Sequence, residues 1–118
     1  MKNLSLEDFK SNIASDKNIV LVDFVASWCG PCKILGPIVD AVSKELDNVT
    51  VIKVDVDSNS DIASEYGIRN IPTVIFFSDG EVFEKFVGVK SKNDIIEIIK
   101  KKSIELTETE KNSDESKN

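Results

Sequence analysis

The chain is organised around one short stretch, Trp28-Cys29-Gly30-Pro31-Cys32. This stretch holds both cysteines and the single tryptophan of the 118 residues. An apolar run at residues 19–26 leads into it, and a segment with helical spacing of apolar residues, 35–46, leads away. Two thiols three positions apart at a strand-to-helix junction indicate reactive chemistry rather than packing alone.

The spacing of the two cysteines suits a reversible disulfide. At positions i and i+3 of a first helical turn, two Cβ atoms lie about 5–6 Å apart, so a small adjustment brings the sulfurs into bonding geometry. Cys29 stands at the helix start, where free N–H groups and the helix dipole stabilise a thiolate. We therefore expect Cys29 to attack a substrate disulfide and Cys32, expected to be the more buried, to resolve the intermediate. Pro31 stiffens the first turn, and Gly30 lets a partner chain approach closely.

Other uses of a Cys pair fit the sequence less well. A structural zinc site needs about four ligands, whereas this chain has two Cys and no His, so no metal site is predicted. An iron–sulfur cluster shared between two copies remains an alternative. A static disulfide is another, although so short a loop adds little stability by chain entropy.

Composition excludes several classes of function. The hydrophobic and charged contents, 41% and 31%, are those of an ordinary globular domain. The net charge of −6 argues against nucleic acid, whose binding depends on basic residues. The N-terminus lacks the apolar stretch of a secretory signal, and no run approaches the roughly 18 apolar residues of a membrane span. We expect a cytoplasmic monomer that binds no membrane, in which a Cys pair is redox-active rather than a staple.

The order of elements predicts an α/β fold. Strands are expected at residues 2–4, 19–26, 49–56, 73–77 and 82–87, and helices after Ser5, around residues 33–46, up to Tyr66 and from Ser91. Asp79-Gly80 between the last two strands is a strong hairpin signal. The strand–helix–strand unit over residues 20–56 requires a parallel pair. The sequence therefore predicts a mixed central sheet of about five strands flanked by four helices.

The C-terminal segment has a different composition. Beyond about Leu106 the chain is polar and repetitive in Glu, Lys, Ser and Asn, which buries too little apolar surface to offset the entropy of ordering. We predict one domain over residues 1–106 and a disordered tail over residues 107–118.

Two charged residues interrupt apolar strands. Asp23 is costly to bury as an anion, so inside the sheet its pKa would be raised and it could exchange a proton with Cys32; the alternative is a strand end in water. Lys53 on the neighbouring strand could approach Asp23, although a side chain whose ammonium reaches solvent is the simpler interpretation. Trp28 suits either the core or a contact surface. At Ile71-Pro72 the sequence alone favours the trans bond.

The chain resembles the thioredoxin family over roughly residues 2–104. The matching segments, at the family's separations, are Val22-Asp23-Phe24, Trp28-Cys29-Gly30-Pro31-Cys32-Lys33, Pro37, Lys53-Val54-Asp55, Tyr66-Gly67-Ile68-Arg69, Ile71-Pro72-Thr73 and Val87-Gly88. Two features depart from the family: Val25 stands where many members have a second tryptophan, and the polar tail is additional.

The resemblance implies a thioredoxin fold and roles for residues outside the cysteine loop. It implies that Asp23 is the buried acid–base group, with Lys53 as its charge partner. It also implies a cis Pro72 beside the cysteines. The implied substrate-binding groove contains Trp28, Gly30, Pro31, Ile71, Pro72, Thr73 and Gly88.

The function implied is protein-disulfide reduction by thiol–disulfide exchange, serving cell redox homeostasis. No bound cofactor is expected: the implied electrons come from NADPH through thioredoxin reductase, and the implied clients are disulfide-containing proteins. In this family the reactive cysteine has a pKa of about 7, and the disulfide has a reduction potential of about −270 mV. Two rivals remain open. One is a disulfide oxidase or isomerase, against which Gly30-Pro31 argues, and the other is a binding module that needs neither cysteine.

Overall fold

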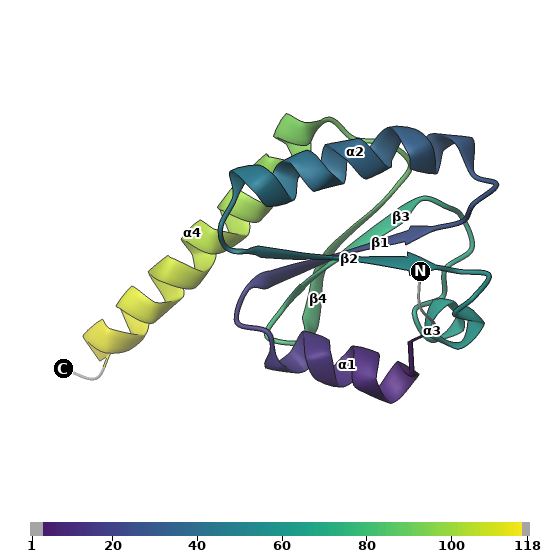
Figure 1. The fold of residues 1–118 in the computed structure, drawn as a ribbon. Helices are drawn as coiled ribbons and strands as arrows, with labels where there is room; N and C mark the ends of the chain where they lie inside the picture. The colour runs from purple at the N-terminus through teal and green to yellow at the C-terminus, as the bar shows by residue number, and fades with distance from the viewer. Residues whose placement is uncertain (1–3, 117–118) are drawn as a thin grey trace.

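The structure, a computed structural model, describes residues 4–116, with side chains to residue 108. Four helices and four strands follow one another as α1 (Leu6–Ser15), β1 (Ile19–Val25), α2 (Gly30–Glu45), β2 (Val49–Asp55), α3 (Ser60–Glu65), β3 (Thr73–Ser78), β4 (Glu81–Val87) and α4 (Lys92–Ser116). Figure 1 shows a twisted sheet between two layers of helices, α2 and α4 on one face and α1 and α3 on the other. The predicted α/β class is confirmed.

The sheet places β1 at its centre. The strand order is β2-β1-β3-β4, with β1 parallel to β2 and antiparallel to β3. The described residues form four strands where about five are predicted. The remaining predicted strand covers residues 2–4: residues 2 and 3 lie outside the described residues, and Leu4 is not in a strand.

Local signals fix the ends of several elements. Ser5 caps α1 by accepting a hydrogen bond from the Asp8 N–H at 3.0 Å, and Ser91 accepts one from the Asp94 N–H at 3.1 Å. In the β3–β4 turn, Asp79 and Gly80 both have positive φ, 51° and 81°, as the tight hairpin turn predicted from this pair requires.

The two faces of the sheet carry separate cores. On one face β1 packs against α2 and α4, and on the other Phe24 and its neighbours pack against α1 and α3. Strand residues alternate between the faces, so Asp23 lies on the same face as Ile19 and Leu21, beneath α2. The sheet thus directs one carboxyl group toward the helix that carries the cysteines.

Helix α4 runs further than the predicted domain boundary at residue 106. Its backbone stays helical to Ser116, through most of the predicted disordered tail, and its C-terminal part extends away from the sheet (Figure 1). The side chains of residues 104–108 are exposed. The first half of α4 is docked on the sheet and has already nucleated the helix, so each further residue adds one backbone hydrogen bond. This local stabilisation does not depend on burial of apolar surface.

Candidate active site

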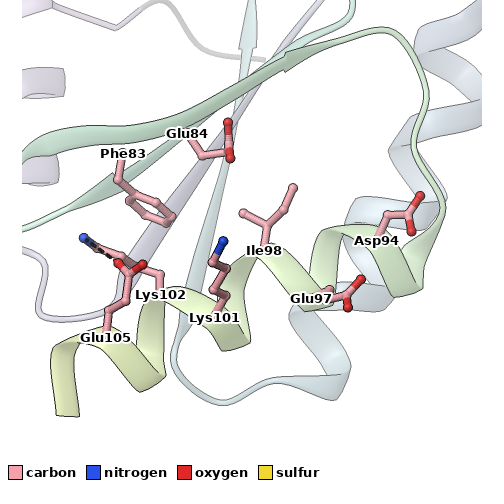
Figure 2. A pocket seen from close by; sticks show the side chains of 8 residues that line it. All are labelled: Phe83, Glu84, Asp94, Glu97, Ile98, Lys101, Lys102 and Glu105. Atoms are coloured by element: carbon pink, nitrogen blue, oxygen red, sulfur yellow. Dashed lines mark ion pairs between the residues drawn. The ribbon is translucent and has the colours of Figure 1, made fainter. Parts of the chain in front are cut away.

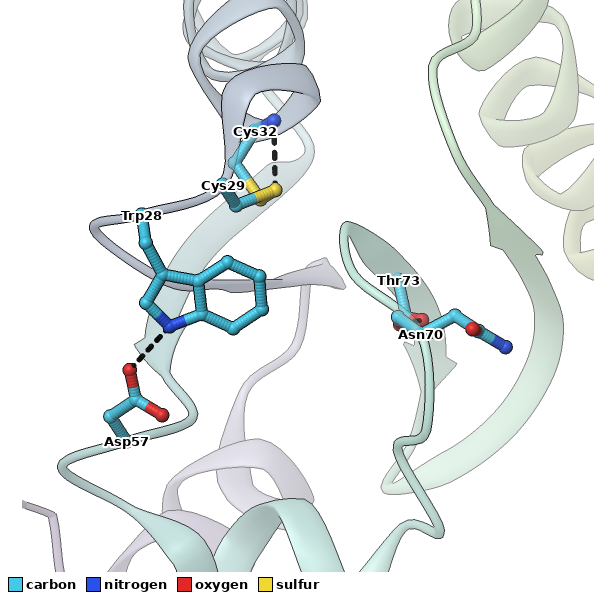
Figure 3. The surroundings of a disulfide bond; sticks show 6 residues. All are labelled: Trp28, Cys29, Cys32, Asp57, Asn70 and Thr73. Carbon is cyan, nitrogen blue, oxygen red and sulfur yellow. Dashed lines mark hydrogen bonds between the residues drawn. A yellow bond between two sulfur atoms is a disulfide. The ribbon is translucent and has the colours of Figure 1, made fainter.

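The cysteine loop joins the end of β1 to the start of α2. Cys29 is the N-cap of α2, with extended backbone (φ −88°, ψ 110°), and its sulfur accepts a hydrogen bond from the Cys32 N–H at 3.2 Å. The two cysteines form a disulfide with their Cα atoms 5.3 Å apart (Figure 3). The predicted placement of both thiols at the first turn of a helix is confirmed.

The two cysteines do not differ in exposure as predicted. Cys29 is 4% exposed and Cys32 6%, so the expectation that Cys32 is the more buried is wrong for the disulfide form. The bond holds both sulfurs in one small cluster with Ala26, against which Val56 and Ile71 pack. The cysteines differ in their surroundings, because Cys32 lines a cavity of about 190 Å³ that is open to solvent and Cys29 does not.

Asp23 lines the same cavity. The residue is 0% exposed, and neither carboxylate oxygen has a hydrogen-bond partner among the described residues. Burial raises the pKa of Asp23 from 3.8 to about 6, while the charge of Lys53 acts to lower it and that of Asp40 to raise it. The interpretation of Asp23 as a strand end in water is therefore wrong, and the group can gain or lose a proton close to neutral pH.

Lys53 also lines this cavity, but its ammonium has another partner. Asp23 and Lys53 are paired in the register of β1 and β2, as the resemblance leads one to expect. The Lys53 Nζ nevertheless lies 2.9 Å from Oδ1 of Asp40 on α2, and the side chain is 35% exposed. Lys53 therefore acts on Asp23 through its electric field, while its direct ion pair is made at the protein surface.

The Ile71–Pro72 bond is cis, as the resemblance implies and contrary to what the sequence alone favours. Ile71 packs against the cysteine cluster. Gly88, at φ 93°, donates its backbone N–H to the Pro72 carbonyl at 2.9 Å. Thr73 is buried and its hydroxyl donates to the Asn70 carbonyl. These contacts fix the loop before β3 next to the disulfide.

The outer surface of the site is exposed and partly apolar. Trp28 is 69% exposed, and its indole Nε1 donates to Oδ2 of Asp57 at 2.9 Å (Figure 3). Gly30 and Pro31 are exposed beside it. Trp28 therefore lies at the surface and not in the core.

A larger cavity, of about 540 Å³, lies elsewhere, between β4 and α4 (Figure 2). Most of its lining is charged, including Lys102 and Glu105, whose side chains are 3.7 Å apart. Neither cysteine reaches it. Its size does not make it the reactive site, because none of the groups around it forms a nucleophile and base pair.

Two contacts at the site have no signal in the sequence. Asp40 and Asp57 are ordinary surface acids by pattern, and only the packing of α2 on β2 and of the loop after β2 on the cysteine loop brings them to Lys53 and Trp28. The predicted site residues lie in the cysteine loop, along the cavity that Cys32 lines and in the cis-proline loop, and Gly88, just after β4, is hydrogen-bonded to that loop.

A disulfide at a helix N-terminus, with a buried carboxyl group behind it, defines a thiol–disulfide oxidoreductase. The comparisons with known proteins agree. The thioredoxin family model matches residues 1–101. Thioredoxin of Chlamydia trachomatis is 47% identical over 98 residues, covering 83% of this chain and 94% of the relative. That of Mycoplasmoides gallisepticum is 47% identical over 100 residues, covering 85% and 100%.

Solved structures extend the same likeness to the fold. A mutant thioredoxin from Halobacterium salinarum superimposes with a TM-score of 0.72 at 40% identity, over 76% of this chain and 79% of that one. Oxidised mitochondrial thioredoxin 3 from Saccharomyces cerevisiae gives 0.76 at 30% identity, over 86% and 94%. The chain belongs to the thioredoxin family. It is a protein-disulfide oxidoreductase that acts by thiol–disulfide exchange through the Cys29–Cys32 pair.

No helix within the described residues combines the length and apolar character needed to span a membrane.

Proposed function

We propose that Cys29 is the nucleophile of a cytoplasmic protein-disulfide reductase and that Cys32 is the resolving thiol. The observation that carries this assignment is the position of Cys29 as N-cap of α2. A negatively charged sulfur there lies at the positive end of the helix dipole and accepts a backbone N–H. Cys32 is one turn further along, beside the cavity that holds Asp23.

The reaction transfers two electrons in two exchange steps. The Cys29 thiolate attacks one sulfur of a client disulfide; that S–S bond breaks, a mixed disulfide forms, and the second client sulfur leaves as a thiolate that takes a proton. The Cys32 thiol then loses its proton and attacks the Cys29 sulfur. The Cys29–Cys32 disulfide forms as the mixed disulfide breaks, and the client's remaining sulfur leaves as a thiolate that takes up a proton, so the client is fully reduced.

Asp23 is the proton acceptor for the second step. Its carboxyl group and Cys32 share one cavity, and a pKa of about 6 lets it take the proton as Cys32 attacks and release it afterwards. Lys53 favours the anionic form of Asp23 through its charge.

Clients dock as extended peptides across the exposed end of the site. Trp28, Gly30 and Pro31 form one side of this surface, and the cis-proline loop (Ile71, Pro72, Thr73) with Gly88 forms the other. Affinity comes from the backbone before Pro72, and the apolar surface of Trp28 adds contact area.

The oxidised pair is returned to the thiol form by a flavin-dependent thioredoxin reductase that draws electrons from NADPH. The chain itself needs no bound cofactor for this cycle, because the electrons reside in the two sulfurs. It acts as a monomer, since each copy carries both cysteines and Asp23.

Insulin reduction by the Cys29→Ser and Cys32→Ser proteins tests the assignment. Neither variant should turn over. Cys32→Ser should accumulate a mixed disulfide with the client, and Cys29→Ser should not. Wild-type turnover by Cys29→Ser would show that Cys29 is not the nucleophile. Accumulation of the mixed disulfide in Cys29→Ser, and not in Cys32→Ser, would show that the two cysteines have the opposite roles.

A further inference from the structure

The ammonium group of Lys53 has two carboxylates within its reach. One is Asp23, its register partner on the adjacent strand, which is fully buried and has no hydrogen-bond partner among the described residues. The other is Asp40, which is 51% exposed and holds the Lys53 Nζ at 2.9 Å. The ion pair thus forms with the solvated acid and leaves the buried one unpaired.

The local packing of α2 accommodates this arrangement. A Cβ atom built on Gly36 would lie 3.8 Å from the Lys53 Nζ, so the lysine side chain passes against the helix backbone at a position without a side chain. Asp40 stands one helical turn further along α2, on the same face. From there its carboxylate holds the ammonium at the outer edge of the cavity that Asp23 and Cys32 line.

We propose that Asp40 is a positioning residue for the proton acceptor of the site, because it holds the Lys53 ammonium at the surface and withholds it from a direct ion pair with Asp23. This inference deepens the proposed function and rests on the role of Asp23 in it. With Asp40 in place, Asp23 keeps only the distant field of the lysine. Without Asp40, the ammonium is free to pair with the buried carboxylate.

The charge of Asp40 and its hold on Lys53 both act to raise the pKa of Asp23, as the groups that face Asp23 show. β2 contributes Lys53, α2 contributes Cys32, Lys33 and Asp40, and β3 contributes the uncharged Val74. Removing the Asp40 charge takes away a repulsion that favours the neutral form of Asp23. Releasing Lys53 adds an attraction that favours the anion. Both changes stabilise the ionised carboxyl group.

Titration of the Asp23 carboxyl carbon by ¹³C NMR, in the oxidised protein, tests the proposal without any activity measurement. In Asp40→Asn we expect the pKa of Asp23 to fall by about 1 to 3, the effect of an opposite charge within about 4–6 Å. Asp40→Glu, which keeps the ion pair, should titrate like the wild type. Glu45→Gln is the matched control, since Glu45 is also on α2, is 49% exposed and pairs with Lys92 at 3.0 Å; it should leave the titration unchanged.

The role of Lys53 is separated by a double-mutant cycle. In a Lys53→Met background, Asp40→Asn can act only through its own charge, so the fall in the pKa of Asp23 should shrink to less than half. An equal fall in both backgrounds, or no fall in Asp40→Asn, would overturn the proposal. The titration measures no turnover, so its outcome is independent of catalysis. The proposal for Asp40 can be wrong while Asp23 still accepts the proton of Cys32, and it can be right even if Asp23 does not accept that proton.

Discussion

Asp23 and Cys32 line the same solvent-open cavity of about 190 Å³, one from the centre of the sheet and the other from the first turn of α2. A buried carboxyl group without a hydrogen-bond partner destabilises a fold when it is ionised. Its position beside Cys32 supports the proposed role of Asp23 as a proton acceptor. The following predictions depend on this relationship and on the contacts around it.

Asp23→Asn should stabilise the oxidised protein at neutral pH. Because the pKa of Asp23 is raised in the folded state, the folded chain binds more protons than the unfolded chain between pH 3.8 and 6, and stability falls as pH rises through that window. The variant should gain about 3 kcal/mol at pH 7 and little at pH 4. Urea unfolding at both pH values measures this, and an equal gain at both would contradict the raised pKa.

The resolving step should slow in acid. Only ionised Asp23 accepts the proton of Cys32, so the rate of release from a preformed mixed disulfide should fall about tenfold per pH unit below about 6. In Asp23→Asn this acid limb should disappear, with the rate at pH 7 reduced about 10- to 100-fold. Rapid-quench kinetics supplies the rates; an unaltered acid limb in the variant would assign the proton to another group.

Asp57 should hold Trp28 in position for clients. Asp57→Ala removes the acceptor of the indole N–H, a hydrogen bond worth about 1 kcal/mol, so KM for a protein client should rise by about fivefold with kcat unchanged. Asp57→Asn keeps an acceptor oxygen and should restore KM. A loss of kcat in Asp57→Ala would instead indicate a direct effect on the cysteines.

Two glycines at the site should respond differently to alanine. Gly88 has a φ of 93°, a region that costs a residue with a side chain about 1–2 kcal/mol, so Gly88→Ala should be destabilised by that amount. Gly30 begins α2, and an added Cβ meets nothing within 4 Å, so Gly30→Ala should lose no stability. Chemical denaturation of both variants compares them directly, and equal destabilisation would show that backbone conformation is not the cause.

Removal of residues 107–118 tests the predicted domain boundary. The side chains of residues 104–108 are exposed, so a chain ending at Leu106 should match the full chain in unfolding free energy to within about 0.5 kcal/mol and in insulin reduction. A larger loss would show that the end of α4 stabilises the domain.

Short-range patterns predicted much of this fold because their causes are local. The Ser5 cap and the Asp79-Gly80 turn satisfy backbone groups within a few residues. The apolar run that forms β1 predicts a strand buried on both faces. The spacing of Cys29 and Cys32 likewise predicts their disulfide, since one helical turn brings the two sulfurs together.

Long-range contacts could not be predicted from such patterns. The choice of Lys53 between Asp23 and Asp40 depends on how α2 lies over β2, and no spacing along the chain records it. The packing of Ile71 against the two cysteines likewise brings together residues about 40 positions apart. The cis bond at Pro72 followed from the family resemblance, since most prolines in that context are trans.

The direction of electron flow is the central claim, and a redox titration of the Cys29–Cys32 pair against a dithiol buffer tests it most directly. We predict a midpoint potential of about −270 mV, the value of the thioredoxin family, at which the reduced pair donates electrons to client disulfides. A potential above about −200 mV would place the protein among disulfide oxidases and isomerases and would contradict its assignment as a reductase.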